Sequence, residues 1–271
     1  MFEIIDKQNI AVNTIKLDIK APDIAKSRLP GQFVLIMPTA ESERAPFTIM
    51  DANIEKGTIS VIIQVVGVAT KRIDKLNIGE SLYAVVGPLG KPTEIEKFGN
   101  VCCIGGGVGT AVMYPIAKAL KNIGNKIYSI IGARSKEHLI LEKEMAAVSD
   151  YFEITTDDGS IGKKGFVTDA LQQLIDTNIK LDLLFAIGPA IMMKNVVLLA
   201  KRYNLKTIVS LNSIMIDGTG MCGSCRVSVN NKTKFVCVDG PEFDGVEIDW
   251  DNLILRQNAF KHQEQCALDR Y

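Results

Sequence analysis

A short glycine-rich segment near the C-terminal end, Asp217–Cys225, gathers most of the residues that could bind a metal. It contains Cys222 and Cys225, and Cys237 follows further along the chain. Plant-type [2Fe-2S] proteins hold their cluster with a C-x4-C-x2-C spacing and a more distant fourth cysteine. This chain keeps that spacing with an aspartate, Asp217, in the first position. The pattern therefore predicts a [2Fe-2S] cluster with three thiolate ligands, Cys222, Cys225 and Cys237, and one carboxylate ligand, Asp217.

Two other interpretations of these cysteines exist. A structural zinc site also takes thiolates and carboxylates, but zinc ribbons usually carry two paired C-x2-C knuckles and this chain has one. Buried free cysteines are the second alternative, which so glycine-rich a loop disfavours. The remaining cysteines are not expected to be ligands: Cys102 and Cys103 fill a buried strand, and Cys266 is a surface thiol.

A second glycine-rich segment, Gly105–Thr110, lies where a predicted buried strand meets a predicted helix. Glycines at such a turn let the backbone approach a pyrophosphate, whose charge the helix N-terminus favours. The segment departs from the dinucleotide-binding fingerprint, because Thr110 takes the third glycine position and no acidic residue ends the next strand. A tight connection without a ligand is therefore the alternative. Arg134, which follows that next strand, is either a phosphate ligand or a solvated surface residue.

The elements that must position these segments change in type near Asn100. Before it, short runs rich in Val, Ile and Thr predict strands at 10–19, 32–37, 58–66 and 81–86, which is typical of a small barrel or sandwich. After it, strands predicted at 101–104, 126–132, 151–156 and 181–187 alternate with helices at 110–122, 138–148, 166–175 and 190–203. That alternation predicts a parallel sheet. A loop-rich region starts near Leu211 and closes with a helix at 250–258.

Composition bounds the remaining choices. The chain has 271 residues, 47% of them hydrophobic, and 31 basic side chains balance 31 acidic ones. Such a chain folds, and its length suits two domains with a small third one. Because basic and acidic side chains balance, the composition has no excess of positive charge that would favour binding to nucleic acid. The longest apolar runs, 59–69 and 183–193, are too short to cross a bilayer. The first residues include Glu3 and Asp6 and do not resemble a signal peptide, so we expect a cytoplasmic protein with no membrane partner.

Taken together, these motifs resemble the ferredoxin-reductase superfamily, in the branch that holds the electron-transfer subunit of dihydroorotate dehydrogenase. Within that branch the sequence is most similar to the small (alpha) subunits of NADH-dependent ferredoxin:NADP oxidoreductases and to the related sulfide dehydrogenase subunits. The resemblance covers essentially the whole chain. It is carried by the segments Arg44–Ile49, Gly67–Thr70, Gly87–Gly90, Gly105–Gly109, Thr156–Ser160, Gly165–Thr168, Gly188–Met193, Asp217–Cys225 and Phe235–Pro241.

The resemblance implies a fold of a β-barrel plus an α/β domain. Residues 1–98 would form a FAD-binding β-barrel, residues 99–208 a parallel-sheet NAD(P)-binding domain, and residues 209–271 a small [2Fe-2S]-binding region. Many relatives have an arginine at the position of Ala45, so the neighbouring Arg44 is expected to supply that phosphate contact. The residues that the resemblance assigns to FAD are Arg44, Pro46, Phe47, Thr48, Ile63, Gln64, Val65, Ala69 and Thr70.

The resemblance also assigns a dinucleotide site to the second domain. NAD(H) is expected there because the resembled subunit uses it. NADP(H) is the alternative, since Arg134 suits a 2′-phosphate. Hydride transfer to a flavin needs stacking more than an acid or base, so no catalytic residue is expected, and His138 and His262 are placed on solvated helix faces. The residues assigned to the dinucleotide are Gly106, Gly107, Val108, Gly109, Thr110, Arg134, Asp157, Asp158, Gly188, Pro189 and Met192.

The function that the resemblance implies is that of an electron-transfer subunit, an oxidoreductase that passes electrons between NAD(H), FAD and the cluster. The expected partner is a larger subunit with its own FAD and [4Fe-4S] clusters, in a heterodimer that acts on NADPH and ferredoxin and couples them by flavin-based bifurcation. The alternative is the electron-transfer subunit of an NAD-linked dihydroorotate dehydrogenase, whose pattern has four cysteines where this chain has Asp217. A regulatory module that senses redox state and a zinc-dependent reductase are the further alternatives.

Overall fold

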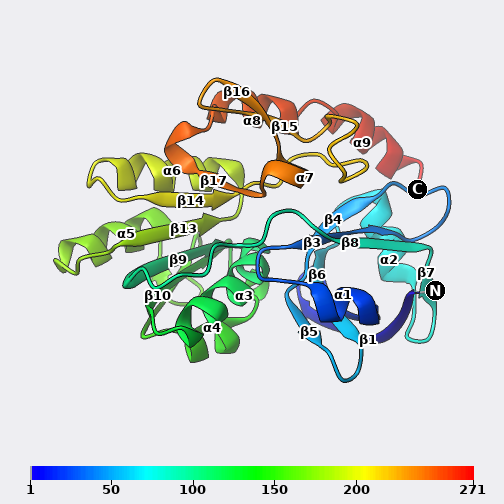
Figure 1. The fold of residues 1–271 in the computed structure, drawn as a ribbon, viewed down its shortest axis with the longest axis horizontal. Helices are drawn as coiled ribbons and strands as arrows, with labels where there is room; N and C mark the ends of the chain where they lie inside the picture. The colour runs from blue at the N-terminus through cyan, green and yellow to red at the C-terminus, as the bar shows by residue number, and fades with distance from the viewer. Residues whose placement is uncertain (1) are drawn as a thin grey trace. The chain divides into compact units, whose positions relative to one another are not determined.

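The structure, a computed structural model, describes residues 2–271 and divides them between two compact units (Figure 1). Unit 1 consists of Met1–Pro92, Asn212–Pro241 and Asp251–Tyr271, and unit 2 consists of Thr93–Leu211 and Glu242–Trp250. The C-terminal region thus contributes to both units. The division into three domains at residues 98/99 and 208/209 stays a prediction.

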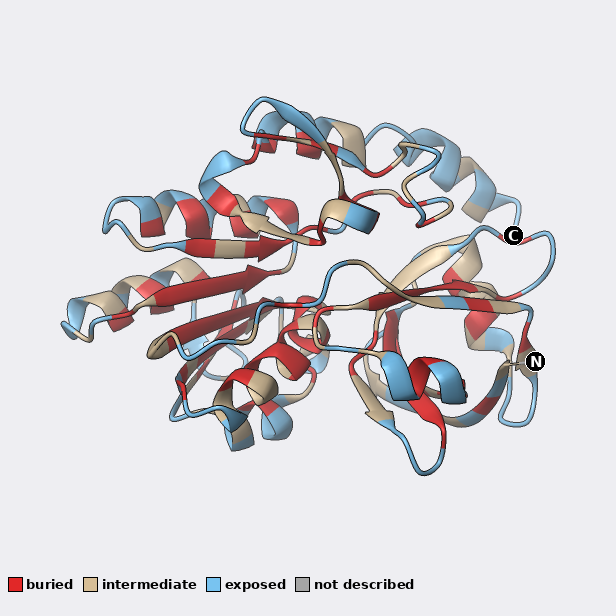
Figure 2. Ribbon diagram, viewed as in Figure 1, coloured by how far each residue is buried: buried red, intermediate tan, exposed pale blue. Residues whose placement is uncertain are grey.

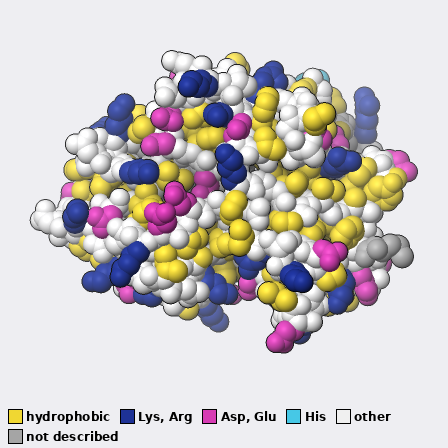
Figure 3. Space-filling model, in the orientation of Figure 1, with side chains coloured by type: hydrophobic (Ala, Val, Ile, Leu, Met, Phe, Trp, Pro, Cys, Tyr) yellow, Lys and Arg dark blue, Asp and Glu magenta, His cyan; other side chains and the backbone are white. Residues whose placement is uncertain are grey.

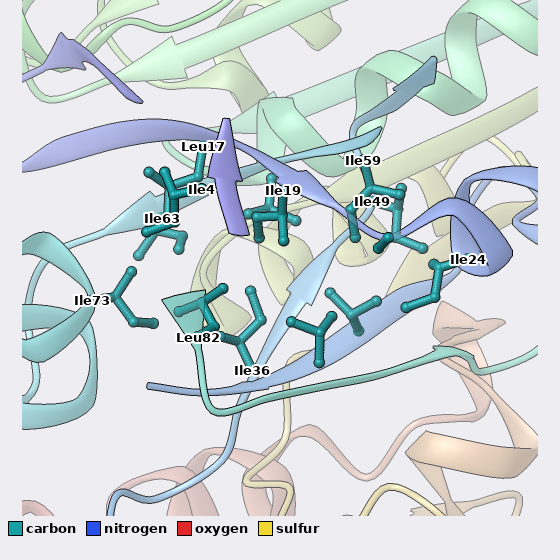
Figure 4. Packing of buried hydrophobic residues seen from close by; sticks show 14 of the residues in the cluster. Ile4, Leu17, Ile19, Ile24, Ile36, Ile49, Ile59, Ile63, Ile73 and Leu82 are labelled. Carbon is teal, nitrogen blue, oxygen red and sulfur yellow. The ribbon is translucent and has the colours of Figure 1, made fainter. Parts of the chain in front are cut away.

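Unit 1 is built on two antiparallel sheets that enclose one apolar core. Their strand orders are β5-β6-β2-β1-β7 and β4-β3-β8. Because alternate side chains of each strand point inward, Leu17 and Ile19 of β2 and Ile36 of β3 meet in the same core (Figure 4). The elements are β1 (Phe2–Ala11), β2 (Thr14–Lys20), α1 (Pro22–Ser27), β3 (Phe33–Met37), β4 (Ala45–Thr48), β5 (Asp51–Asn53), β6 (Thr58–Gln64), α2 (Val68–Lys75), β7 (Ser81–Leu82) and β8 (Ala84–Leu89).

A loop in the C-terminal segments of unit 1 packs on the second face of β3. Val34 and Ile36 point into the barrel core, whereas Leu35 lies against the loop that contains Gly218. A Cβ atom added to Gly218 would lie 2.7 Å from Leu35 Cδ1, so the loop packs directly on the barrel. The elements of these segments are β15 (Arg226–Val229), β16 (Lys232–Phe235), α7 (Val236–Asp239), α8 (Trp250–Gln257) and α9 (Lys261–Asp269).

Unit 2 contains the predicted parallel sheet, with the strand order β12-β11-β10-β9-β13-β14-β17. Every pair in it is parallel except β14 with β17. The strands are β9 (Asn100–Gly106), β10 (Lys126–Ala133), β11 (Tyr151–Thr156), β12 (Lys163–Lys164), β13 (Leu183–Ile187), β14 (Thr207–Ser210) and β17 (Glu242–Asp244). The helices are α3 (Gly109–Asn122), η1 (Lys136–His138), α4 (Glu142–Val148), α5 (Val167–Asp176), α6 (Ala190–Lys201) and η2 (Gly245–Glu247).

Helices cover both faces of this sheet. Met113 of α3 and Met145 of α4 share a core with Ile131 of β10. The next residue of β10, Gly132, faces α5 instead, because a Cβ there would lie 2.5 Å from a methyl group of Val167. The chain therefore winds from β9 through β10 to β11 on one side and continues through β13 to β14 on the other. The strand order reverses between β9 and β13, and such a switch point is where open α/β sheets bind ligands.

Two sequence-based expectations about elements were wrong. The run 10–19 is not one strand: β1 ends at Ala11, the chain turns through Asn13 at φ 49°, and β2 begins at Thr14. The helix predicted at 138–148 begins later, at Glu142, after the short η1. Both differences arise at residues in the left-handed region, Asn13 and Leu141, where neither glycine nor proline marks the turn.

Burial follows the sheets in both units (Figure 2). On the face drawn in Figure 3, acidic and basic side chains are interspersed among hydrophobic ones. Among residues 2–271, no helix combines the length and the apolar character that a membrane span requires.

Candidate functional site

The turn between β9 and α3 lies at the switch point of unit 2. Gly107 adopts a φ of 54°, and its N–H donates to the carbonyl of Gly132 at 2.8 Å. A Cβ at Gly107 would meet nothing within 4 Å, so open space lies over this residue. The N-cap residue of α3, Val108, makes no side-chain capping bond. Thr110 and Ala111 donate their N–H groups to the preceding turn, to Gly107 O at 3.1 Å and Val108 O at 3.0 Å, and the positive end of the α3 dipole lies beside the open space at Gly107. A helix start of this kind suits a dinucleotide pyrophosphate.

The other glycines of this turn hold it against the turn that follows β13. A Cβ at Gly106 would lie 2.3 Å from Met192 Sδ, and one at Gly109 would lie 2.3 Å from the carbonyl oxygen of Ile187. Gly188 packs on Gly106 in the same way, with 3.1 Å between its would-be Cβ and Gly106 Cα. The structure thus brings together the residues predicted at the ends of β9 and β13. Gly106, Gly109 and Gly188 allow the two turns to pack closely, whereas Gly107 leaves space for a ligand to approach the backbone.

The ends of β10 and β11 meet at the same edge of the sheet. The N–H of Asp157 donates to Ala133 O at 3.1 Å, and that of Asp158 donates to Arg134 O at 3.2 Å. The carboxylate of Asp158 accepts hydrogen bonds from the hydroxyl and N–H of Ser160, which lower its pKa. Arg134 is exposed beside these carboxylates.

The residues predicted for FAD lie on β4, at the end of β6 and at the start of α2. In β4, Pro46 pairs with Leu35 and Phe47 with Val34 of β3, and the whole strand is half-buried. Ile63 is fully buried in the barrel core, so any contact of Ile63 with FAD comes from its backbone. The exposed Gln64 follows it at the end of β6.

Thr70 shapes the turn that precedes α2. Its hydroxyl oxygen accepts hydrogen bonds from the N–H groups of Val66 at 3.0 Å and Gly67 at 2.9 Å. These bonds fix the turn between β6 and the start of α2, which includes Ala69. A Cβ at Gly67 would meet nothing within 4 Å, so the N-terminus of α2 is accessible to an anion.

Sequence reasoning missed a second arginine near the predicted Arg44. Arg44 is exposed, whereas Arg72 of α2 donates to the hydroxyl of Ser42 at 2.9 Å. Arg72 therefore lies beside the segment that leads into β4. Its place one helical turn after Ala69 was the available sequence signal.

The predicted cluster ligands form two pairs in unit 1. Cys225 Sγ lies 3.2 Å from Cys237 Sγ, and both residues are buried. Asp217 is half-buried, and its carboxylate accepts the N–H of Cys222 at 2.9 Å and that of Thr219 at 2.8 Å. In the described part of the chain, no three Cys, His, Asp or Glu side chains converge on one ion. Two separate pairs are what the two irons of a [2Fe-2S] cluster require, because each iron takes two protein ligands besides the bridging sulfides.

The loop between these pairs has the backbone that a cluster needs. Gly218, Gly220 and Gly223 have φ values of 75°, 83° and 67°, which side chains other than glycine rarely adopt. Burial and the hydrogen bond from Cys225 raise the pKa of Cys237 to about 12, so loading a metal there displaces a proton. The residues present therefore fit an iron-sulfur cluster. Of the two histidines, His138 Nδ1 lies 2.8 Å from the hydroxyl oxygen of Ser135.

Three segments of the chain match known protein families in chain order. Residues 1–93 match an oxidoreductase FAD-binding domain, residues 103–197 an oxidoreductase NAD-binding domain, and residues 212–249 the iron-sulfur cluster binding domain of dihydroorotate dehydrogenase B. A Thermotoga maritima protein named as a homolog of the electron transfer subunit of dihydroorotate dehydrogenase B (NAD(+)) is 46% identical over 99% of this chain and 95% of its own length. The chain belongs to this family of electron transfer subunits.

Two further relatives bear on the branch within the electron transfer subunit family. A probable subunit of the same name from Methanocaldococcus jannaschii is 37% identical over 80% of this chain and 79% of its own length. A solved structure of an NADH-dependent reduced ferredoxin-NADP oxidoreductase has a chain that is 46% identical, with a TM-score of 0.94 over 100% of this chain and 97% of that one. The protein is thus an oxidoreductase electron transfer subunit with FAD-, NAD- and iron-sulfur-binding domains, and its relatives are named as parts of a complex.

Proposed function

We propose that this chain is the small subunit of a complex of the NADH-dependent ferredoxin:NADP oxidoreductase type. It carries electrons between NAD(H) and a larger partner subunit that has its own FAD and [4Fe-4S] clusters. The observation that carries the proposal is the match, over the whole chain, to the solved oxidoreductase of that name. Asp217 in the first ligand position supports it, since a four-cysteine pattern is expected of the orotate branch.

The residues of the chain bind and orient the reactants. The open backbone at Gly107 and the uncapped start of α3 hold the dinucleotide pyrophosphate in this proposal. β4 and the start of α2 hold FAD, with Thr70 fixing the turn between barrel and helix. The chemistry supplied by the bound groups is hydride transfer at the flavin followed by single-electron transfer at the iron-sulfur centre.

In this proposal the cluster loop accepts electrons from the flavin of the barrel, because the loop packs directly on the barrel. Gly218 lies against Leu35 of β3 and against Leu89 of β8, with 2.7 and 2.8 Å between its would-be Cβ and their methyl groups. β4, which carries part of the FAD site, pairs with β3 on the barrel side. One strand, β3, therefore separates the proposed flavin-binding strand from the proposed cluster loop. This short path suits electron transfer within unit 1.

Two measurements test the proposal. The purified chain should contain flavin, iron and acid-labile sulfide, and it should reduce a one-electron dye with NADH. In complex with the larger subunit, NADPH oxidation should require both NAD⁺ and a ferredoxin acceptor. If NADPH oxidation proceeds equally well without ferredoxin, the complex does not bifurcate electrons.

The second candidate is the subunit of an NAD-linked dihydroorotate dehydrogenase, which the names of several relatives favour. In that case the chain would co-purify with a flavoenzyme that oxidises dihydroorotate. Reduction of NAD⁺ by dihydroorotate in the purified complex would establish this function and exclude the first one.

A further inference from the structure

Two arginines from separate elements hold the backbone between two of the proposed cluster ligands. Gly223 and Ser224 are the two residues that separate Cys222 from Cys225. Arg226, the first residue of β15, donates from Nη1 to Gly223 O at 3.1 Å. Arg256, in the last turn of α8, donates from Nη2 to Ser224 O at 3.1 Å. Figure 1 shows α8 beside the β15–β16 hairpin that brings them together.

The two guanidinium groups are charged neighbours without an acidic partner. Among the ion pairs of residues 2–271, Arg28 is matched with Asp51, but neither Arg226 nor Arg256 is matched with a carboxylate. Burial first, and then the charge of Arg226, lower the pKa of Arg256. Cys225 acts in the opposite direction and raises it, which places a prospective thiolate within the field of this cation.

Such a like-charged pair is unfavourable unless an anionic group compensates it. The proposed ligands supply one. A [2Fe-2S] core carries fewer positive charges than three thiolates and one carboxylate carry negative ones, so the loaded site is net negative. One further negative charge arrives on reduction, and a nearby positive charge favours the reduced form, because net charge is one of the determinants of cluster potential.

We propose that Arg226 and Arg256 form a cationic pair that raises the reduction potential of the iron-sulfur cluster bound at Asp217, Cys222, Cys225 and Cys237. The inference rests on the ligand set of the proposed function. The pair sets how readily the cluster accepts an electron from the flavin, and it does so by charge and not by contact with the irons. Arg226 is exposed and Arg256 is half-buried, so the field of Arg256 is the less screened of the two.

The test compares neutral and charged replacements. Arg226→Gln, Arg256→Gln and Arg256→Lys are purified as full chains, and iron, sulfide and the oxidised visible spectrum are measured first. The midpoint potential then comes from a redox titration followed by electron paramagnetic resonance. At a fixed potential, each Gln variant should have a roughly tenfold smaller ratio of reduced to oxidised cluster, which for a one-electron couple is a shift of about 59 mV to lower potential. Arg256→Lys, which keeps the charge, should stay close to the wild type.

Arg270→Gln is the matched control, because it removes the same charge from an exposed position at the end of α9 in unit 1. Its potential should equal that of the wild type. The proposal is overturned if the Gln variants keep their iron and the wild-type potential, or if Arg256→Lys shifts as far as Arg256→Gln. It is also overturned if both Gln variants lose their iron while the control keeps it, because the arginines would then only brace the loop. A wild-type chain without iron and sulfide would instead contradict the proposed function.

Discussion

Asp217 has two roles to perform if it is a cluster ligand. Its carboxylate already accepts two backbone N–H groups, from Thr219 and Cys222, and the first of these bonds contributes most to lowering its pKa. The side chain is therefore an anion at neutral pH and is held next to Cys222. A carboxylate is also a harder donor than a thiolate, so it should change the electronic properties of the iron that it binds.

Replacing Asp217 separates the two roles. The two N–H groups bind different oxygens of Asp217, so Asp217→Asn keeps an acceptor for one of them and loses the anionic donor; we expect iron content to fall and the visible spectrum to change. Asp217→Cys restores a four-thiolate pattern and should keep the cluster with an altered paramagnetic resonance signal. The measurements are iron and sulfide analysis, the visible spectrum and the paramagnetic resonance spectrum of each variant. Unchanged iron content and spectra in Asp217→Asn would show that Asp217 orders the loop and does not bind the cluster.

Glu242 is a second residue whose protonation the fold controls. It lies half-buried at the start of β17, opposite Ser210 of β14, and accepts a hydrogen bond from the hydroxyl of Thr93. Burial raises its pKa from 4.5 to about 7, although the bond from Thr93 acts in the opposite direction. The folded protein therefore holds this proton at a pH where the unfolded chain has already lost it.

Protonation of Glu242 should affect how the free energy of unfolding depends on pH. Between about pH 4.5 and pH 7 the folded state binds more protons at Glu242 than the unfolded state, so this residue makes stability fall as the pH rises. Above pH 8, Glu242→Gln should be more stable than the wild type by roughly 3 kcal/mol, from 1.36 kcal/mol per pKa unit, and near pH 4.5 the two should agree. Urea unfolding across this range measures it. Glu247→Gln, at an exposed site, is the control. A pH-independent difference would contradict the assignment.

At the scale of elements, the turn between β9 and α3 uses its glycines for two different purposes. Gly109 is needed because the carbonyl of Ile187 leaves no room for a side chain. Gly107 is needed for its φ of 54° and stands in open space. The same substitution at these two positions should therefore have different effects.

Gly109→Ala should push α3 away from β13 and cost several kcal/mol of stability, as overpacking of a close contact does. Gly107→Ala should cost only about 1 kcal/mol, for the left-handed backbone, and should leave the protein folded. Its methyl group, however, stands where the pyrophosphate approaches, so affinity for NADH should drop at least tenfold. Urea unfolding and NADH titration separate these effects. Equal NADH affinity in Gly107→Ala and the wild type would show that the dinucleotide binds at another place.

How far the sequence predicts these elements depends on what each one buries. The parallel strands of unit 2 were predictable because they are short continuous apolar runs, as in Leu183–Ile187, that alternate with helical segments. β1 was missed because Glu3, Asp6 and Lys7 interrupt its pattern, and α9 because none of its residues is buried. The proposed cluster ligands are predicted from local spacing. The packing of Gly218 on Leu35 is not, because it joins segments far apart in the chain and leaves no local signal.

At the scale of the whole molecule, the barrel needs residues from the far end of the chain. Leu35 is 1% exposed and Phe33 is 3% exposed, yet part of their cover comes from the loop at Gly218 and from Pro241, which lies 3.0 Å from the would-be Cβ of Gly90. A chain that stops at Leu211 should therefore expose the outer face of β3 and aggregate.

A pair of truncations tests this dependence. The chain ending at Leu211 should be largely insoluble and should not retain FAD. A chain ending at Phe260 loses α9, Arg270 and Tyr271, none of which contributes a buried residue, and should fold with normal cofactor content. Soluble yield and bound flavin are the measurements. A soluble, flavin-containing protein ending at Leu211 would show that the barrel is complete without the C-terminal segments.

The interleaved path of the chain also orders events during synthesis. The strands of the barrel leave the ribosome before Thr93–Leu211, and Asn212–Pro241, which finish unit 1, emerge only after that segment. Domains generally fold as they are made, at about 5–20 residues per second. The nucleotide-binding sheet can thus form most of its strands while the barrel still waits for its last segment. The proposed ligands emerge only after Thr93–Leu211, so the proposed cluster can be inserted only once the segment that covers β3 has been made.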